Sequence, residues 1–599
     1  MNRIIFSLII FILVTSIILP SCSDQKETSS DGMLYLNTEL AGDENNWSFV
    51  GIPKWKEGDK GVIYPPVWSN PLFDRGPELI PHSYAHELAR EDYAFIKSKP
   101  LENIDITVDY KCYYGAVVHG GVIFRAIDSR RYYELEVRDN GRKGSSYDLV
   151  LYVQDSSGYR REIAKKSMPH SVVPDRFVQG GRMKNKAEWY QSGPDWVTIR
   201  IQATGSFIRV SMDGQIAYDL RDTTYPIGRV GLAAIGAVAF RNLVVKGTES
   251  KTPVLWEKYD GEFPKYFLPG GEQPVGFNAY PVVCQTDNNK IIAVWSHSDS
   301  TSKYEDGSVI LCTYSDDEGR LWSKPKVIYK KDGYGCIATA LYAHRNGTVS
   351  LIFSAIPRKE KEREGQTLVM RSKTDGKTWS VTKEFLVAGK PMSSYKNVNL
   401  YSIISRLSNN NVVMTGYQAV LIKGAKHESN ATRKDQSLLF RSYDDGFTWE
   451  EPSYFDKNNY DHNECMVAEV NPGHLVAYMR TLRAPYMWKS TSNDYGHTWA
   501  SLVQSEMRDV SCPFLLKLSK GPLILGSRGP GTFIDISYDD GETWSKPYRI
   551  SPASAMMSMV EMPDGRVLIL MHEGYRWFGG KIRGQFFRVT PDGPMAVVK

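Results

Sequence analysis

Two arginines and two glutamates stand at the ends of strand-like segments in the second half of the chain. Glu464 begins one segment, Arg480 and Arg528 end two others, and Glu573 ends a fourth. A planar guanidinium can hold a carboxylate through two parallel hydrogen bonds, and a pair of carboxyl groups can act as acid and base on a glycosidic bond. These residue types could therefore bind a carboxylate group and supply an acid and a base for catalysis.

Further titratable and polar side chains occupy comparable positions in the same half. The candidate acid–base groups are Glu464, Glu573, Asp509 and His462, and the candidate substrate-binding groups are Arg480, Arg528, Asn278, His297, Tyr417 and Tyr575. Each of them alone could equally be a salt-bridge partner or a buried structural residue. Their expected convergence on one concave surface makes the set a functional hypothesis. No cluster of cysteines and histidines has metal-ligand spacing, so the sequence predicts neither a metal site nor a cofactor.

One eight-residue motif, S-x-D-x-G-x-T-W, organises this half of the chain. Its five copies begin at Ser315, Ser372, Ser442, Ser492 and Ser537. Successive serines are 57, 70, 50 and 45 residues apart, and a period near 50 is typical of propeller blades. The aspartate can bind the backbone of its own turn, the glycine allows a positive φ, and the tryptophan packs beneath. We interpret the motif as structural and expect the turn to tolerate Leu321 in place of threonine and Thr374 in place of aspartate.

Six strand–turn–strand units indicate six blades. They cover residues 278–296, 335–353, 399–417, 463–480, 511–528 and 557–573, and the first five each precede one box. The last blade would be closed by a strand near residues 254–259 or by residues 585–589, because closure protects the sheet edges. Inner strands begin and second strands end around one mouth of such a channel, so the candidate residues are expected to meet there.

The first half, residues 33–248, alternates apolar and polar residues with the period of β-strands and shows no sustained helical period. Residues 205–245 contain a strand, a tight Asp213-Gly214 turn and two more strands. This run resembles the closing strands of laminin-G/concanavalin-like jelly rolls, which implies a β-sandwich that binds glycans or serves structure alone. Residues 249–253 are interpreted as a linker to residues 254–599. The predicted fold class is all-β, a jelly-roll β-sandwich followed by a six-bladed β-propeller.

Five such boxes in a six-bladed propeller resemble the sialidase superfamily over about residues 254–599. The family's "N-E-x-x-x-x-E … R" blade is matched by Asn463-Glu464, Glu469 and Arg480. The resemblance implies that Glu464 activates a nucleophilic tyrosine and that Arg480 holds a substrate carboxylate. Arg528 matches a second carboxylate-binding arginine, and Glu573 in Met571-His572-Glu573 matches the family's late glutamate.

Two departures argue against ordinary sialic-acid hydrolysis. The family's early arginine falls where this chain reads Asn278-Ala279-Tyr280-Pro281, so that arginine is missing. The family's nucleophilic tyrosine falls at or near Met556, which cannot attack carbon. We therefore expect a sialidase-like propeller whose substrate or chemistry differs from that of a typical sialidase.

Three functions stay open on the sequence alone. The leading hypothesis is a glycoside hydrolase acting on a poly- or oligosaccharide with an acidic or unusual terminal sugar. The second is a polysaccharide lyase on uronic acids, in which His297, His462, Tyr417 or Tyr575 would be the base. The third is a glycan-binding protein without catalysis.

The amino-acid composition limits the kinds of molecule that this protein could bind. The chain has 73 Lys and Arg against 68 Asp and Glu, a formal net charge of +5, and no long basic run, which excludes nucleic acid as a partner. Five of the 14 tryptophans belong to the boxes, so stacking on sugars would rest on others such as Trp295, Trp488 and Trp577. The six cysteines after Cys22 lie mostly in apolar runs and are interpreted as buried thiols, although the sequence leaves a disulfide between two of them open.

The N-terminus predicts export. Asn2-Arg3 precede an apolar run, Ile4 to Leu19, that is shorter than the ~20 residues of a membrane-spanning helix, so residues 1–22 are interpreted as a secretory signal. Its end, Leu19-Pro20-Ser21-Cys22, resembles a bacterial lipoprotein cleavage box, which implies a lipid on Cys22. Residues 23–32 would be a flexible tether. We expect a protein of the cell envelope, at the outer membrane or cell surface, that meets the membrane only through this lipid.

Overall fold

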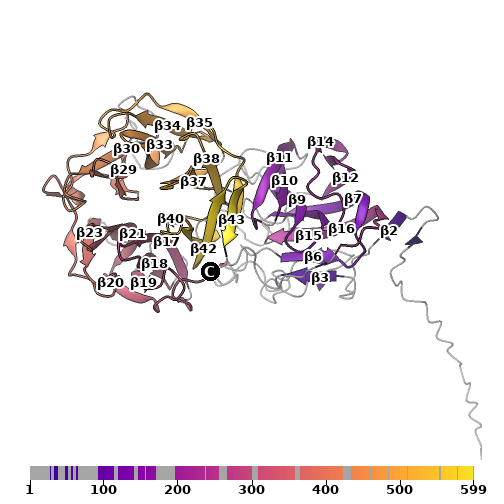
Figure 1. The fold of residues 1–599 in the computed structure, drawn as a ribbon, viewed down its shortest axis with the longest axis horizontal. Helices are drawn as coiled ribbons and strands as arrows, with labels where there is room; N and C mark the ends of the chain where they lie inside the picture. The colour runs from indigo at the N-terminus through magenta and orange to yellow at the C-terminus, as the bar shows by residue number, and fades with distance from the viewer. Residues whose placement is uncertain are drawn as a thin grey trace, which may run out of the picture.

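The computed structural model describes most of residues 92–599 and five short strands before them. Within 92–599, the description leaves out residues 113–118, 140–145, 156, 170–195, 236–237, 255, 257–265, 275, 300–307, 358–364, 402, 422–432, 457–460, 483, 509, 530, 552–554, 576–577 and 598–599. The predicted signal segment with Cys22, together with Asp509 and Trp577, lies outside the described residues. The described chain is almost entirely β-structure (Figure 1). No helix in it is long and apolar enough to span a membrane.

The first half folds into two antiparallel sheets. One follows the order β1 (Glu27–Thr28), β2 (Met33–Asn37), β16 (Val238–Glu249), β7 (Leu101–Cys112), β12 (Val197–Thr204), β13 (Phe207–Met212) and β14 (Gln215–Arg221), with β4 (Lys56–Glu57) and β5 (Ile63–Tyr64) attached at β16. The other follows β3 (Trp47–Val50), β6 (Asp92–Ile96), β15 (Arg229–Ile235), β8 (His119–Ala126), β9 (Tyr132–Asp139), β10 (Ser146–Gln154) and β11 (Arg160–Pro169). This is the predicted β-sandwich. Its strand β1 falls within the segment 23–32 predicted as a tether and pairs with β2.

Alternating side chains build the sandwich core. In β12, Val197, Ile199 and Ile201 are buried, and the two residues between them are exposed, because successive strand residues face opposite sides of a sheet. These side chains join one apolar cluster between the two sheets. The turn between β13 and β14 has φ of 49° at Asp213 and 77° at Gly214. Positive φ at both residues is what a two-residue type I′ hairpin requires, as the Asp-Gly pair predicts.

Six blades follow the sandwich and are arranged in a ring (Figure 1). Blade 1 consists of β17 (Phe277–Gln285), β18 (Ile291–Ser298), β19 (Val309–Ser315) and β20 (Lys326–Lys330). Blade 2 consists of β21 (Tyr334–Ala343), β22 (Val349–Pro357), β23 (Gln366–Ser372) and β24 (Lys383–Glu384). Blade 3 consists of β27 (Val398–Leu400), β28 (Ser405–Arg406), β29 (Val412–Leu421), β30 (Arg433–Ser442) and β31 (Ser453–Tyr454). Blade 4 consists of β32 (Asn463–Asn471), β33 (His474–Arg480), β34 (Tyr486–Ser492) and β35 (Val503–Arg508). Blade 5 consists of β36 (Ser511–Lys517), β37 (Leu523–Arg528), β38 (Thr532–Ser537) and β39 (Tyr548–Ser551). Blade 6 consists of β40 (Met557–Glu561), β41 (Val567–Tyr575), β42 (Phe578–Thr590) and β43 (Gly593–Val597). The hairpin β25 (Leu386–Val387)–β26 (Lys390–Pro391) and the 3-10 turn η6 (Met392–Ser394) lie between blades 2 and 3.

The C-terminal strands complete the last blade. The sequence offered two alternatives for the closing strand, residues 254–259 and residues 585–589. Residues 585–589 lie in β42, and β43 pairs with β42 at the outer edge of the blade. The other segment, 254–259, lies mostly outside the described residues. β42 also pairs with β17 through Asn278 and Gly580, which joins the last blade to the first.

The five boxes form the same turn. In every copy the first serine Oγ accepts the N–H of the glycine at 2.7–2.9 Å. The two deviating copies keep the turn, as predicted. Thr374 Oγ1 accepts the N–H of Thr378 at 2.8 Å in place of the missing aspartate. Asp317 still accepts the Leu321 N–H at 2.7 Å, so the replacement of threonine by leucine loses only a side-chain hydroxyl.

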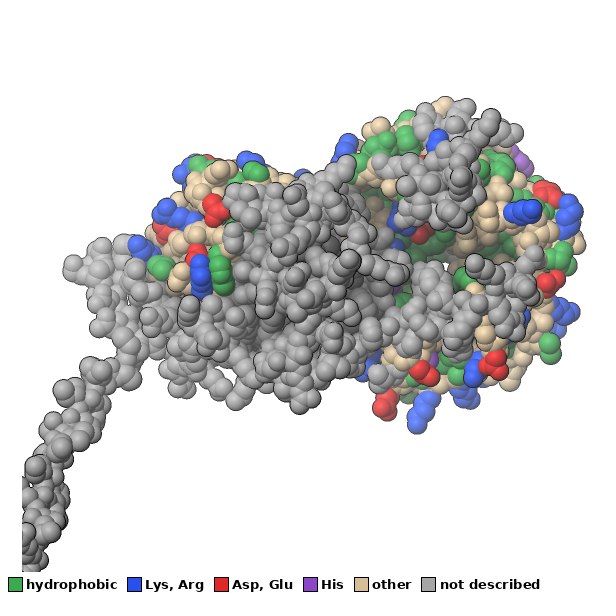
Figure 2. Space-filling model, turned by 180° about the vertical axis from the view of Figure 1, so that it is seen from behind, with side chains coloured by type: hydrophobic (Ala, Val, Ile, Leu, Met, Phe, Trp, Pro, Cys, Tyr) green, Lys and Arg blue, Asp and Glu red, His purple; other side chains and the backbone are tan. Residues whose placement is uncertain are grey.

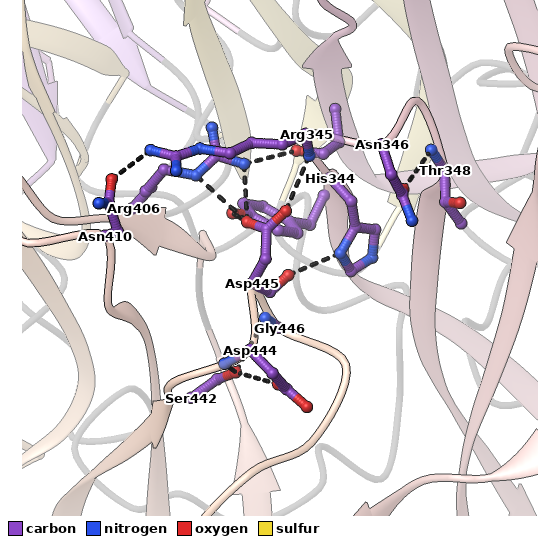
Figure 3. A network of polar contacts seen from close by, with 12 residues as sticks. His344, Arg345, Asn346, Thr348, Arg406, Asn410, Ser442, Asp444, Asp445 and Gly446 are labelled. Atoms are coloured by element: carbon purple, nitrogen blue, oxygen red, sulfur yellow. Dashed lines mark hydrogen bonds and ion pairs between the residues drawn. The ribbon is translucent and has the colours of Figure 1, made fainter.

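The box of blade 3 also braces blade 2 (Figure 3). Asp445 accepts the backbone N–H of Arg345 at 2.8 Å and pairs with Arg406 Nη2 at 2.8 Å, while its carbonyl contacts His344 Nδ1 at 2.6 Å. His344 and Arg345 belong to the hairpin between β21 and β22, and Arg406 to β28. The box therefore ties neighbouring blades together, which supports its structural interpretation.

Replacing Asp444 with alanine is expected to lower the free energy of unfolding by about 1–2 kcal/mol, because the turn loses an acceptor much as a helix loses its cap. Asp444 accepts the Thr448 N–H at 2.8 Å and the Thr448 hydroxyl at 2.7 Å. Thr448→Val, which removes only the hydroxyl bond, is the matched control and should cost less. Thermal unfolding followed by circular dichroism measures both, and equal losses would contradict the expectation.

The sandwich and the propeller share one sheet. β11 pairs with β39 of blade 5, so β3 to β36 form a continuous 11-stranded sheet, and the sandwich lies beside the last blades (Figure 1). Behind this seam Glu136 forms ion pairs with Arg138 and with Arg549 of blade 5. All three side chains are at most 8% exposed. Polar side chains of this sandwich sheet thus hold the two folds together.

Candidate functional site

A cavity of about 420 Å³ opens where the inner strands of the blades begin. Its wall includes the charged residues Glu464, Arg480 and Arg528, the tyrosines Tyr280, Tyr401 and Tyr417, and apolar residues such as Ile337, Leu400, Met466, Phe514 and Met556. In the view of Figure 2 the propeller is hollowed at its centre, and hydrophobic side chains gather around the hollow. The dimensions suit one or a few sugar rings.

Bulges in the inner strands of three blades aim side chains at this region. The ladders of blades 1, 4 and 5 each shift register just after the strand begins, between residues 279 and 282, 463 and 466, and 511 and 514. At the equivalent place Tyr280, Glu464 and Cys512 have φ of 55°, 41° and 55°. Such values are unfavourable for residues other than glycine and concentrate at functional sites, and a bulge redirects a side chain that a regular strand would turn away.

Glu464 is the centre of a charged cluster. Its Oε2 pairs with Arg480 Nη1 at 2.8 Å and accepts the thiol S–H of Cys512 at 2.9 Å. The Glu464 and Arg480 side chains are 13% and 16% exposed. Burial works to raise the pKa of Glu464, but Arg480 and Arg528 outweigh it, and the net shift of this pKa is downward. Glu464 is therefore held as a carboxylate.

Arg528 contributes an unneutralised positive charge. Its guanidinium forms no hydrogen bond or ion pair with any residue that the structure describes, although it lies close enough to Glu464 and Cys512 to influence their pKa values. Glu464, Arg480 and Arg528 are the charged members of the described cavity wall, which leaves it with one excess positive charge. A planar guanidinium that faces a cavity without a partner is suited to an incoming carboxylate.

Tyr401 is a phenol of the same cluster. Burial, followed by the neighbouring thiol of Cys512 and carboxylate of Glu464, raises the pKa of Tyr401 well above its usual range. Burial likewise raises the pKa of the Cys512 thiol to about 11, against the opposing effect of Arg528. Both groups are protonated in the cluster, and the Cys512 thiol donates its proton to the Glu464 carboxylate.

The structure brings together only part of the predicted set. Glu464, Arg480, Arg528 and Tyr417 lie on the cavity wall. Asp509 lies outside the described residues, and Glu573 and Tyr575 are described only as backbone of β41. Met556 lies on the wall, so a methionine does occupy this part of the cavity.

Asn278 and His297 do not line the cavity. Asn278 is fully buried, and its Oδ1 accepts the indole N–H of Trp295 at 3.0 Å and contacts His297 Nδ1 at 3.1 Å. The other ring nitrogen of His297 contacts Asp299 at 3.0 Å. The predicted substrate-binding role of both residues disagrees with this placement, and Trp295, at 0% exposure, cannot stack on a sugar.

His462 and Glu469 are likewise placed away from the cavity. The His462 ring is 1% exposed, and its Nδ1 accepts the backbone N–H of Ser437 at 3.0 Å, so it packs between strands instead of facing a substrate. Glu469 lies at the far end of β32, where it accepts the N–H groups of Ser408 at 2.6 Å and Gly473 at 2.8 Å. Catalysis by His462 is therefore not supported by its environment.

We expect His462 to make stability fall as the pH decreases. Burial lowers its pKa from 6.5 to about 4, and the unfolded chain therefore binds a proton that the folded chain refuses. This contribution to stability is complete above about pH 6.5 and is lost as the pH falls toward 4, by on the order of 3 kcal/mol. The unfolding free energy of the chain minus that of His462→Asn, measured from pH 4 to 7, should show this slope. A difference independent of pH would contradict it.

Three residues at or next to the cavity escaped the sequence-based prediction: Tyr280, Tyr401 and Cys512. Tyr280 and Cys512 lie at the start of inner strands and Tyr401 directly follows the short strand β27. We named their neighbours instead, because a regular alternation places these side chains on the other face. A proline follows both Tyr280 and Cys512. Proline cannot donate to a sheet ladder and marks irregular pairing, so it was the available signal of the bulge.

The described residues contain no group of three or more His, Cys, Asp or Glu side chains that could hold a metal ion. Five cysteines among them, Cys284, Cys312, Cys336, Cys465 and Cys512, are free and buried. This agrees with their interpretation as buried thiols.

Comparison with known proteins places two domain types in the chain. Residues 289–525, which span blades 1 to 5, match a family described as a BNR repeat-like domain, and residues 43–246, in the sandwich, match a 3-keto-alpha-glucoside-1,2-lyase-like domain. A curated protein of Bacteroides fragilis named "Sialidase" is 26% identical over 227 residues, which are 35% of this chain and 39% of that protein. The match thus spans about two fifths of the relative's length.

Two solved bacterial structures are among those similar to this chain. A Dyadobacter fermentans protein of unknown function is 16% identical, with a TM-score of 0.45, and the match covers 54% of this chain and 97% of that one. A sialidase from Streptococcus pneumoniae is 11% identical, also with a TM-score of 0.45, and covers 82% of this chain and 97% of its own. The chain is sialidase-like in its repeats and resembles carbohydrate-active proteins of the glycoside hydrolase type.

Proposed function

We propose that the protein is a glycoside hydrolase whose propeller cavity binds a glycan with an acidic terminal sugar. The observation that carries the proposal is the charge arrangement of the cavity wall. Arg480 is paired with Glu464, whereas Arg528 faces the cavity without a described hydrogen-bonding partner. A substrate carboxylate would satisfy this guanidinium, and a buried charge is stabilised when it gains such a partner.

Within this proposal the carboxyl groups take different roles. Glu464 is held ionised by the arginines and serves as a base or stabilises positive charge on the sugar, because it has no proton to give at neutral pH. Glu573, or Asp509, would be the acid that protonates the departing oxygen. A lipid on Cys22 would keep the enzyme at the cell envelope, where glycans are its partners.

The lyase hypothesis loses two of its bases. His297 and His462 are engaged in buried hydrogen bonds away from the cavity, while Tyr417 remains on the wall. Hydrolysis is therefore the function that the described cavity favours, and elimination and binding alone become outcomes of the test.

The test is a panel of nitrophenyl glycosides of glucuronic, galacturonic and N-acetylneuraminic acid, with glucoside and galactoside as neutral counterparts. Release of nitrophenol from an acidic member and not from its neutral counterpart is the expected result. Ultraviolet absorbance of an unsaturated product from uronic-acid oligosaccharides would assign the protein to lyases. Calorimetric binding of the free acids without turnover would assign it to glycan-binding proteins.

A further inference from the structure

The described wall of the propeller cavity has two unlike sides. Its charged side chains, Glu464, Arg480 and Arg528, come from blades 4 and 5. The wall residues described in blades 1, 2 and 6 carry no charge, and most of them are apolar, such as Val282 and Met557. Blades 1 and 4 are three places apart in a ring of six, so they face each other across the hollow (Figure 1). A ligand that fills the cavity therefore meets arginines on one side and uncharged side chains on the other.

Tyr280 is the one aromatic residue among the described wall residues of the uncharged side. It lies on β17 at the register shift between Ala279 and Val282, and its φ is 55°. A positive φ is unfavourable for a residue that has a side chain, and such conformations persist where the surroundings require them. The bulge of blade 1 therefore keeps a partly exposed phenol ring on the cavity wall, opposite the blade that supplies Glu464.

We propose that Tyr280 binds the sugar ring of the substrate, with C–H groups of the sugar against the face of the phenol ring, while the substrate carboxylate binds Arg528. The proposal rests on the function proposed above and adds a specificity-determining residue to the same site. It is not carried over from the sialidase superfamily, because the resemblance leads one to expect an arginine in the segment from Asn278 to Pro281.

The two surfaces of a sugar ring match the two sides of the cavity. Hydroxyl and carboxyl groups lie around the edge of the ring, whereas C–H groups cover much of its faces. A tyrosine presents a large, rigid and mostly apolar face, and it loses little conformational freedom when a ligand packs on it. The hydroxyl of Tyr280 is not needed for such a contact, because the sugar packs on the face of the aromatic ring.

Together the two residues would select acids that carry a ring. Arg528 by itself would bind the carboxylate of a sugar acid and that of a short acyclic acid equally well. Tyr280 adds affinity only for an acid that extends across the cavity to blade 1. A volume of about 420 Å³ has room for a sugar ring between them. We therefore expect the site to prefer sugar acids to acyclic acids.

Binding of the free acids tests this role directly. Ligand-observed NMR titrations with glucuronic, galacturonic and N-acetylneuraminic acid, and with lactate as an acid without a ring, measure the affinities. Tyr280→Ala should weaken the binding of the preferred sugar acid about tenfold and leave that of lactate unchanged, whereas Arg528→Ala should weaken both. Tyr280→Phe should bind like the unchanged chain. Tyr280→Gly removes the ring with a residue that accepts a positive φ, and it should match Tyr280→Ala.

Tyr443→Ala is the matched control, because it removes a tyrosine that is 59% exposed in the box of blade 3, and it should leave all affinities unchanged. Sugar-acid binding that neither Tyr280→Ala nor Tyr280→Gly weakens would overturn the assignment. An equal loss for lactate, or an equal loss in Tyr280→Phe, would overturn it as well. If the unchanged chain binds no sugar acid, both proposals are wrong. Sugar-acid binding that depends on the Tyr280 ring, without nitrophenol release, would contradict the hydrolase function and leave the role of Tyr280 standing.

Discussion

Replacing Arg528 with alanine is expected to lower kcat/KM on an acidic glycoside about 100-fold, because a charge-assisted bidentate pair in a largely enclosed site contributes about 2–4 kcal/mol. Arg528 is the group to remove because it carries the charge that no described residue neutralises. The Glu464–Arg480 pair stays intact in this variant. The fall should therefore report the loss of substrate binding and not the collapse of the cluster.

Two companion variants sharpen this result. Arg528→Lys keeps the charge and loses the planar fork, so it should recover part of the activity and stay about tenfold below the unchanged chain. Arg588→Ala removes an arginine of blade 6 that pairs with Asp564 away from the cavity, and it should leave kcat/KM unchanged. The charge argument fails if Arg528→Ala acts on the acidic glycoside as well as the unchanged chain does. It also fails if the variant's activity falls equally on neutral glycosides.

Glu136→Ala is expected to be the most destabilising single exchange at the joint between the sandwich and the propeller, by about 3–5 kcal/mol. Glu136 forms ion pairs with Arg138 of the sandwich and with Arg549 of blade 5, and the three side chains are nearly fully buried. Removing the carboxylate leaves two buried guanidinium groups without their shared counter-charge. Chemical denaturation and limited proteolysis measure the effect, and cleavage between the two folds should become faster.

The controls separate this effect from charge removal in general. Arg209→Ala breaks an exposed pair with Asp219 in the sandwich, and such pairs contribute at most about 1 kcal/mol. Replacing Glu136, Arg138 and Arg549 together by leucine or methionine should restore most of the lost stability, because no charge is then left unpaired. A Glu136→Ala protein as stable as Arg209→Ala would mean that the joint does not depend on this ion pair.

The sequence predicted the architecture well because the relevant signals are local. Each box forms its turn from residues within eight positions, so a motif search detects it, and even the deviating Thr374 could be assigned correctly. The alternation in β12 reports which residues face the core without knowledge of the partner sheet. The meeting of Glu464, Arg480 and Arg528 at one mouth also followed, since blade topology orders the strand ends.

The functional set was predicted less completely because its members depend on strand irregularity and on burial. Asn278, His297 and His462 stand at the expected strand ends. Their side chains are nevertheless engaged in buried hydrogen bonds with groups that come close only in the folded blades. Tyr401 and Cys512 reach the cluster because strands from different blades converge and a bulge reverses the alternation.

By itself the sequence determined an all-β chain with a sandwich, six blades and two arginines near one glutamate, since periodicity, turn residues and repeats are properties of short segments. Only the tertiary structure decided which of these groups share a cavity and which proton-bearing groups touch. It also decided that one sheet runs from the sandwich into blade 5. Those outcomes depend on contacts between segments far apart in the chain, and their energies depend on how much water the fold excludes from each group.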